Sequence, residues 1–218
     1  MTKFKGLLFD FDGTLAKTME DHFNAWKAVL AEYYIDLKPE DYYPLEGLSL
    51  SELAKSLCAK YNFTPLLPEI IVKKKDDYYL KNHKFELYPG VENLITKLKS
   101  SGILIGMVTT GRAERIKNSV PQDFLSKFNA ITTAEDAPEG KQSAAPYLKG
   151  AEKLGLKPEE CIAVENSPLG VKSAKSAGIY CIAVCNTLEK SHFAEADKVV
   201  SNFEELGKLD VIKKLAEK

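Results

Sequence analysis

The sequence lacks long hydrophobic runs, an excess of one charge and closely spaced cysteines. Its longest apolar runs, such as Ile103–Val108, are far shorter than the roughly 20 residues of a membrane-spanning helix, so we expect no membrane partner. The 30 basic and 31 acidic residues leave a net charge of −1, which gives no support for nucleic-acid binding. Acidic residues directly follow the first short apolar stretch, which is not typical of a secretory signal. We therefore expect a cytoplasmic protein.

The four cysteines, Cys58, Cys161, Cys181 and Cys185, form no CxxC pair. Three of them lie in apolar, strand-like stretches, which favours small buried side chains in a reducing compartment. A metal site at Cys181 and Cys185 would need further ligands, and no histidine follows them before His192. The cysteines therefore predict neither disulfides nor a metal centre.

Short apolar stretches alternate with helical patterns over most of the chain, which is typical of a parallel sheet with helices on both faces. We therefore expect an α/β fold with a Rossmann-like core formed by residues 1–16 and 85–218. The predicted strands are Gly6–Phe11, Ile103–Thr109, Ala130–Thr133, Cys161–Glu165 and Tyr180–Cys185, and the predicted helices are Val91–Ser100, Ala144–Leu154 and Leu169–Ala177.

Residues 17–84 interrupt this alternation because they contain no convincing strand. Three helical patterns occur there: Asp21–Tyr34, Ser49–Tyr61, and a third that Pro65 and Pro68 open and that continues to Leu80. Ser49 has the features of an N-cap, with Glu52 completing a capping box. The charges at Lys73–Asp77 favour a solvated helix face. We expect an all-helical cap domain inserted after the first strand.

Two acidic residues, Asp10 and Asp12, end the first predicted strand and precede Gly13 and Thr14. Side chains at i and i+2 of an extended chain share one face, and open α/β sheets bind ligands at the carboxyl ends of their strands. Solvated acids before a turn would explain a lone Asp-x-Asp equally well. The longer Asp-x-Asp-Gly-Thr arises by chance in only about one chain in five hundred of this length, so it favours a functional site.

The sequence resembles the haloacid dehalogenase superfamily, whose first motif is Asp-x-Asp-Gly-Thr after the first strand. Three further motifs match in order: Thr109 after an apolar strand, Lys141 before a helix, and the acidic position Glu165 with Asn166 at the end of another strand. The resemblance covers nearly the whole chain and identifies the superfamily far better than the substrate.

The resemblance implies phosphoryl transfer. Asp10 would attack phosphorus to form an aspartyl-phosphate, and Asp12 would act as general acid and base. Mg²⁺ would be held by Asp10, the Asp12 carbonyl and the fourth-motif residues Glu165 and Asn166. Lys141 would supply a fixed positive charge. The phosphate would meet the Thr109 hydroxyl, Thr110, and a helix start at Gly111 and Arg112.

Two positions depart from the family pattern. Asn166 stands where an Asp is usual; it can coordinate Mg²⁺ without contributing charge, or it can cap the following helix, and we favour coordination. Lys141 is followed by Gln142-Ser143-Ala144-Ala145, which lacks an Asp that helps to anchor this loop in the family.

The helical insert is typical of the branch that contains phosphoglycolate phosphatases and β-phosphoglucomutases. His22 lies in a stretch that resembles the first cap helix of the mutases, where a His contacts the acid/base Asp. The resemblance implies that His22 gates Asp12 and belongs to the substrate site, whereas the residue taken alone would also fit an exposed helix position. Mutases carry basic residues where this chain has Glu46 and Leu50, although Arg112 and Arg115 are possible substitutes. We therefore expect a magnesium-dependent phosphatase acting on a small phosphorylated metabolite.

The alternatives are a β-phosphoglucomutase-type mutase and, with less support, a dehalogenase or a non-catalytic phosphate-binding module. Asp12-Gly13-Thr14 argues against the dehalogenase, which needs neither Asp12 nor Mg²⁺. The substrate and the oligomeric state are left open by the sequence.

Overall fold

The computed structural model describes residues 4–63 and 68–216. A six-stranded, fully parallel sheet in the order β3-β2-β1-β4-β5-β6 forms the core, which agrees with the predicted α/β class. The strands are β1 (Gly6–Asp10), β2 (Leu104–Val108), β3 (Ala130–Thr132), β4 (Cys161–Glu165), β5 (Tyr180–Val184) and β6 (Lys198–Val200).

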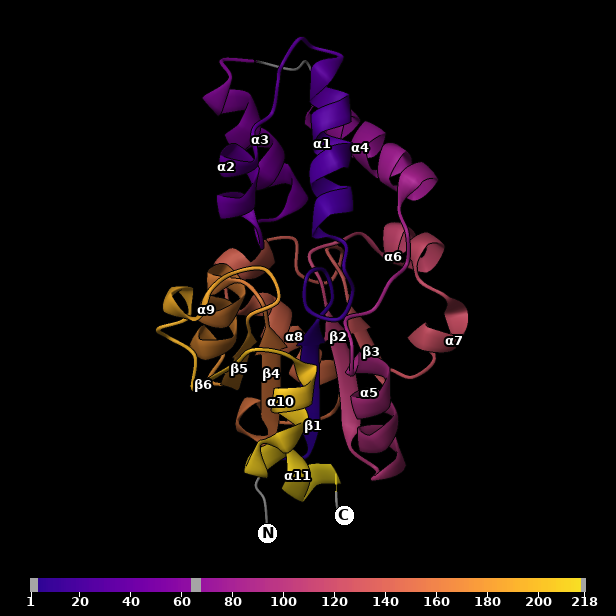
Figure 1. Ribbon diagram of the computed structural model, residues 1–218, viewed down its shortest axis with the longest axis vertical. Coiled ribbons are helices and arrows are strands. Elements are labelled where there is room, and N and C mark those ends of the chain that lie inside the picture. Colours follow the sequence, from indigo (N-terminus) through magenta and orange to yellow (C-terminus); the bar gives the residue numbers. More distant parts are fainter. Residues whose placement is uncertain (1–3, 64–67, 217–218) are drawn as a thin grey trace.

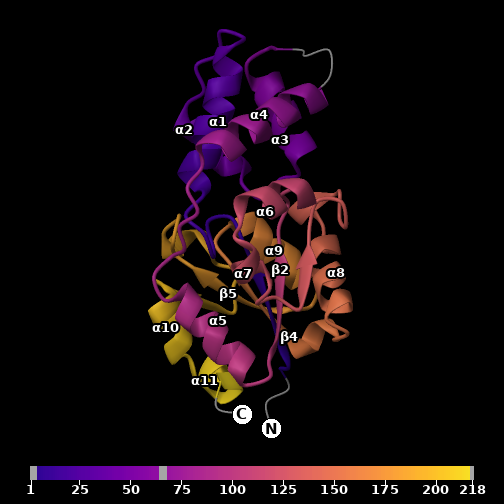
Figure 2. The ribbon, with the colours of Figure 1, turned by 90° about the vertical axis from the view of Figure 1, so that its right-hand side faces the viewer.

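Helices cover both faces of the sheet (Figures 1 and 2). Leu7 and Phe9 of β1 pack with α5, α10 and α11 on one face, whereas Leu8 packs with α8 and α9 on the other. Both faces of the central strand are thus buried, which explains its continuous apolar sequence. The core helices are α5 (Val91–Ser100), α6 (Ala113–Ser119), α7 (Gln122–Leu125), α8 (Ala145–Lys153), α9 (Pro168–Ser176), α10 (Phe203–Lys208) and α11 (Asp210–Ala216), with 3₁₀ turns η2 (Gly140–Gln142), η3 (Pro158–Glu160) and η4 (Lys190–His192).

The five predicted strands are present within one or two residues at each end, and α5 has the predicted bounds. Strand β6 was not predicted. It begins with the exposed Lys198, and only its last residue, Val200, is buried, so its sequence lacks the continuous apolar stretch that marks the other strands.

The insert is helical and sits above the carboxyl ends of the strands (Figure 1). It contains α1 (Met19–Ala31), α2 (Pro39–Tyr42), the 3₁₀ turn η1 (Tyr43–Leu45), α3 (Leu50–Lys60) and α4 (Pro68–Asn82). Trp26, Leu30 and Leu57 are among the side chains of its own hydrophobic core. The cap can therefore pack as a unit, while the residue boundaries 16/17 and 84/85 stay predictions.

Two details of the cap bear on the sequence analysis. Ser49 is the N-cap of α3 and accepts a hydrogen bond from the Glu52 amide at 3.3 Å, whereas the Glu52 carboxylate pairs with Lys55. The expected helix start at Pro65 lies outside the described residues.

The prediction that Lys73–Asp77 forms a solvated face is wrong for its two central residues. Lys75 and Asp76 are each only 2% exposed. They lie on the buried side of α4, where His22 of the cap contacts Lys75 and Arg112 of the core contacts Asp76. The charge run thus combines an exposed pair, Lys73 with Asp77, and an internal one.

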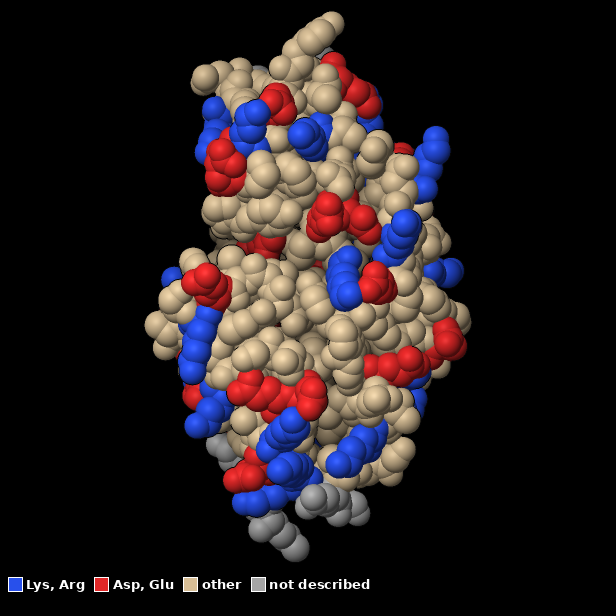
Figure 3. Space-filling model, viewed as in Figure 1, with Lys and Arg blue, Asp and Glu red and all other residues tan. Residues whose placement is uncertain are grey.

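Basic and acidic side chains are interspersed on the face shown in Figure 3, and acidic groups are among those that lie where the cap meets the core. Within the described parts of the chain, no helix has the length and apolar character to span a membrane. The cysteines Cys58, Cys161 and Cys181 are buried and Cys185 is half-buried, all as free thiols.

Candidate active site

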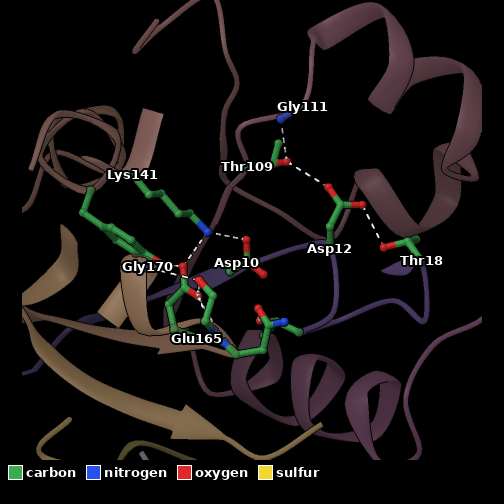
Figure 4. A network of polar contacts seen from close by, with 12 residues as sticks. Asp10, Asp12, Thr18, Thr109, Gly111, Lys141, Glu165 and Gly170 are labelled. Carbon is green, nitrogen blue, oxygen red and sulfur yellow. Dashed lines mark hydrogen bonds and ion pairs between the residues drawn. The ribbon is translucent and has the colours of Figure 1, made fainter. Parts of the chain in front are cut away.

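Asp10 ends β1 inside the molecule, with only 4% of its surface exposed. Its Oδ1 accepts a hydrogen bond from the Lys141 ammonium, which also contacts Glu165 (Figure 4). Burial raises the pKa of Asp10 to about 7; Lys141 opposes this effect, and the negative charge of Glu165 adds to it. Two carboxylates thus share one cation, and the ionised form of Asp10 would gain from further positive charge.

Glu165, at the end of β4, is fully buried, and both of its carboxylate oxygens accept hydrogen bonds. Its Oε1 accepts from Lys141 and from the Tyr147 hydroxyl, the latter at 2.7 Å. Its Oε2 accepts from the amides of Asn166 and Ser167 at 3.0 and 3.2 Å and from the Ser167 hydroxyl at 3.2 Å. A Cβ on Gly170 would lie 2.0 Å from Glu165 Oε1, so only glycine fits there. These contacts hold Glu165 as a fixed support for Lys141.

Asp12 turns toward β2 and the cap (Figure 4). Its Oδ1 accepts from the Thr18 hydroxyl at 2.9 Å and lies 3.0 Å from His22 Nε2. Its Oδ2 accepts from the Thr109 hydroxyl at 3.2 Å. Both oxygens also accept from Arg115, at 3.0 and 2.5 Å. Burial would raise the pKa of Asp12, but the Arg115 charge, helped by His22, holds it well below its usual range. In this arrangement Asp12 is ionised.

Arg115 comes from α6 and is almost completely buried. Its guanidinium lies 5.5 Å from the Tyr79 ring centre and 5.9 Å from that of Phe11. A Cβ built on Gly111 would come within 1.9 Å of Arg115 Nη2, so the absence of a side chain at Gly111 makes room for the guanidinium. The two-pronged ion pair with Asp12 is thus enclosed by aromatic rings and by backbone.

His22, which is 6% exposed, links Asp12 to the cap. Its Nδ1 lies 2.9 Å from Lys75 Nζ, and Lys75 in turn lies 3.3 Å from Asp76 Oδ1. Burial and the Lys75 charge lower the pKa of His22 to about 4, so His22 is neutral at pH 7. Burial also lowers the pKa of Lys75 to about 8, although Asp76 opposes this shift.

Asn166 follows Glu165 and lies against Gly13 of the first motif. Its Oδ1 accepts from the Thr14 hydroxyl at 3.1 Å, and its Nδ2 donates to the Thr187 hydroxyl at 3.0 Å. The capping alternative for Asn166 is wrong, because the N-cap of α9 is Ser167, whose hydroxyl accepts from the Gly170 amide at 3.0 Å. The Asn166 side chain instead joins the first and fourth motifs.

A small cavity of about 70 Å³ lies between cap and core. Asp10, Asp12, Lys141 and Asn166 line its core side, and His22, Glu46, Leu50 and Lys75 line its cap side. Glu46 Oε1 is buried and has no hydrogen-bond partner among the described residues. Burial, followed by the charges of Asp10, Glu165 and Asp12, raises the pKa of Glu46 to about 8.

Magnesium can be tested against this arrangement. Asp10 Oδ2 is buried and accepts no hydrogen bond from any described residue, although Oδ1 faces Lys141. No group of three or more His, Cys, Asp or Glu side chains placed to hold a metal occurs in residues 4–63 and 68–216. A site here would therefore combine the Asp10 carboxylate with neutral oxygens, the Asp12 carbonyl and the Asn166 amide. Such an all-oxygen set fits Mg²⁺.

Most of the predicted site residues gather around this cavity. Its lining includes Thr110 and Gly111, and Thr109 contacts Asp12. Arg112 does not line it: its side chain is 34% exposed and donates to Asp76 at 2.8 Å. Lys75, Asp76 and Arg115 complete the polar network. Of these, only Arg115 was considered for the site from the sequence, as a possible ligand of a second phosphate and not as a partner of Asp12. Their contacts with His22, Arg112 and Asp12 join residues at least 36 positions apart in sequence, so no local pattern identifies them.

The family model described as haloacid dehalogenase-like hydrolase matches residues 7–184. The β-phosphoglucomutase of Bacillus subtilis (strain 168) is 29% identical over 189 residues, which cover 83% of each chain. Hexitol phosphatase A of Escherichia coli (strain K12) is 28% identical over 213 residues, covering 93% of each.

Among solved structures, a mutant of CbbY from Rhodobacter sphaeroides in complex with xylulose-(1,5)bisphosphate superposes with a TM-score of 0.82. It is 26% identical, and the match covers 96% of this chain and 99% of that one. The sequence relatives and this structure thus span both cap and core.

Proposed function

The chain belongs to the haloacid dehalogenase-like hydrolases, and we propose that it is a magnesium-dependent phosphatase acting on a small phosphorylated metabolite, such as a sugar phosphate. The observation that carries this proposal is the Asp10 carboxylate, which is buried at a strand end with one oxygen on Lys141 and the other without a partner. A free carboxylate oxygen beside a fixed ammonium is suited to attack phosphorus, because the cation offsets charge on the phosphoryl oxygens.

In the first step, Asp10 would form a bond to phosphorus as the bond from phosphorus to the alcohol oxygen breaks. The leaving oxygen needs a proton, and Asp12 is the candidate donor. In the second step, water would attack the aspartyl-phosphate and give its proton to Asp12, which releases inorganic phosphate and restores Asp10. The ionised Asp12 of this arrangement suits the second step. The first step requires Asp12 to carry a proton, and therefore a weaker contact with Arg115.

Asp10, the Asp12 carbonyl and Asn166 would hold Mg²⁺. When bound, the ion would neutralise charge on the phosphoryl group and on Asp10. The hydrogen bonds of Glu165 favour a supporting role for that residue, which fixes Lys141.

The mutase alternative has support from the β-phosphoglucomutase relative and from the contact between His22 and Asp12. A mutase must also bind a second phosphate. Glu46 and Leu50 line the cavity where that branch carries basic residues, and Arg112 is paired with Asp76 away from the cavity. These contacts favour hydrolysis.

Phosphate release from a panel of phosphorylated metabolites, with and without Mg²⁺, tests the proposal. We expect the wild type to release phosphate in the presence of Mg²⁺ and to stop when a chelator is added. We expect no phosphate release from Asp10→Asn, because this substitution keeps the shape of the side chain but removes its charge. Asp77→Asn is the matched control, because Asp77 is 60% exposed on α4 and pairs with Lys73. Wild-type activity in Asp10→Asn would exclude the mechanism. Conversion of β-glucose 1-phosphate to glucose 6-phosphate with little free phosphate would favour the mutase.

A further inference from the structure

A second hollow, of about 400 Å³, lies on the seam between cap and core. Met19 and Glu46 line both this hollow and the small cavity beside Asp10, so the two spaces adjoin at these side chains. Its other walls come from both parts of the molecule: Lys17, Glu20, Tyr43, Tyr88, Thr187 and Leu188. Its volume falls within the range of small-molecule sites, whereas the cavity beside Asp10 is far smaller.

The polar groups around this hollow have unused hydrogen-bonding capacity. Glu46 Oε1 is buried without a partner in the described part of the chain, an arrangement that is unfavourable unless a ligand or water supplies a donor. Tyr43 and Tyr88 are half-buried, and the described residues offer no hydrogen bond to either hydroxyl. Two aromatic rings with free hydroxyls therefore stand near an acceptor that is already desolvated.

The hollow offers no unpaired cation in its lining. Glu20 and Glu46 contribute two carboxyl groups, and the one lysine in its lining, Lys17, pairs with Glu86. A second phosphate placed here would therefore find no counter-charge, and it would meet the Glu20 carboxylate. Uncharged hydroxyl groups would instead donate to Glu46, and the tyrosine rings would cover the carbon skeleton.

We propose that this hollow is the subsite for the leaving alcohol, and that it selects an uncharged polyhydroxyl group, a sugar or sugar alcohol, over one with a second phosphate. Glu46 lies at the junction, where it accepts a hydrogen bond from the leaving group. The proposal rests on the phosphatase function above and adds the class of substrate to it.

The test compares three substrates by released phosphate: fructose 6-phosphate, fructose 1,6-bisphosphate and p-nitrophenyl phosphate. We expect the wild-type kcat/KM for fructose 6-phosphate to exceed that for the bisphosphate by about tenfold or more. In Tyr88→Leu, the ratio of fructose 6-phosphate to p-nitrophenyl phosphate should fall by about tenfold, mainly through KM, because the nitrophenyl group needs no hydroxyl partner. In Glu46→Lys, the preference over the bisphosphate should shrink by about tenfold. Glu40→Lys makes the same substitution at an exposed position of α2 and is the matched control for charge.

The outcomes separate the two proposals. If the wild type releases phosphate but both ratios stay within twofold of it in Tyr88→Leu and Glu46→Lys, the subsite is wrong and the phosphatase remains. A wild type that prefers the bisphosphate also overturns the subsite. If the wild type releases no phosphate from any of the three substrates, the phosphatase is wrong and the subsite falls with it. Two variants are used because Glu46→Lys places a charge in a partly buried position, whereas Tyr88→Leu does not.

Discussion

Replacing Arg115 by Met should destabilise the protein more than any surface ion-pair change. The Arg115 side chain is 3% exposed and gives two hydrogen bonds to Asp12, whose side chain is 17% exposed. Met retains much of the apolar bulk but leaves the Asp12 carboxylate without its main counter-charge. Loss of one partner from a buried pair typically costs 3–5 kcal/mol. Because Thr18, Thr109 and His22 still contact Asp12, we expect the lower end, about 3 kcal/mol.

Urea unfolding at pH 7 measures this difference. Lys127→Met is the matched control, because Lys127 pairs with Glu92 at 2.8 Å and the Glu92 side chain is 65% exposed. Pairs of this kind contribute about 0–1 kcal/mol. A cycle with Asp12→Ala then isolates the pairwise term, which we expect to be about 2 kcal/mol, within the usual range for contacting residues. A coupling energy below about 0.5 kcal/mol, or a loss in Arg115→Met no greater than in the control, would refute this reasoning.

Gly111→Ala provides an independent test of the same packing. The added Cβ would come within 1.9 Å of Arg115 Nη2, so the guanidinium must move and its bonds to Asp12 must weaken. We expect a substantial loss of stability in the wild-type background and a much smaller one when Arg115 is already Met. Equal losses in both backgrounds would place the strain elsewhere.

Three further changes probe the site. Asp12→Asn should lower turnover by about 10²–10⁴-fold. The loss should be smaller for p-nitrophenyl phosphate than for an alkyl phosphate, because a good leaving group needs less protonation. Equal losses for the two substrates would argue that Asp12 has a structural role. Asn166→Asp should lower the Mg²⁺ concentration for half-maximal activity, because it adds a negative charge beside Asp10; coincident titration curves would reject direct coordination. The pKa of His22 is about 4 in the folded protein and 6.5 for the free group, so the unfolded chain binds the proton first as the pH falls. The free energy of unfolding of the wild type should therefore fall by up to about 3 kcal/mol relative to that of His22→Gln between pH 7 and pH 4. Urea midpoints that change in parallel in the two proteins would contradict this.

Local patterns predicted the elements whose burial is regular along the sequence, on one face of a helix or on both faces of a strand. Helix α5 has the predicted bounds because Val91, Leu94, Ile95 and Leu98 all pack on the sheet. Strands β1 and β4 are buried on both faces, and their continuous apolar runs followed directly. The acidic residues that end these strands meet at one edge because the strands are parallel neighbours. This part of the site could therefore be derived from the sequence.

Residues on α4 show why the rest of the site could not be predicted from the sequence. Lys75 and Asp76 lie in a run of charges that predicts a solvent-exposed helix face, yet both are buried against polar partners far away in sequence, His22 and Arg112. Arg112 was expected to face the phosphate, but its guanidinium instead forms an ion pair with Asp76 of the cap. Arg115 is likewise explained only by Asp12, which lies 103 residues away in sequence. Contacts between residues that are far apart in sequence leave no periodic signal within a single helix or strand.

The polar contacts from His22 to Asp12 and from Asp76 to Arg112 cross between cap and core. Lys75 and Asp76 belong to the cap, Arg112 and Asp12 belong to the core, and His22 joins Lys75 to Asp12. Separation of the cap would remove His22 from Asp12 and Asp76 from Arg112, but would leave Arg115 on Asp12, since both belong to the core. The proton affinity of Asp12 thus depends on its burial, on Arg115 within the core and on His22 of the cap. Movement of the cap away from the core would remove the His22 contact that helps to lower the pKa of Asp12, so cap position and the readiness of Asp12 for proton transfer would be linked through His22.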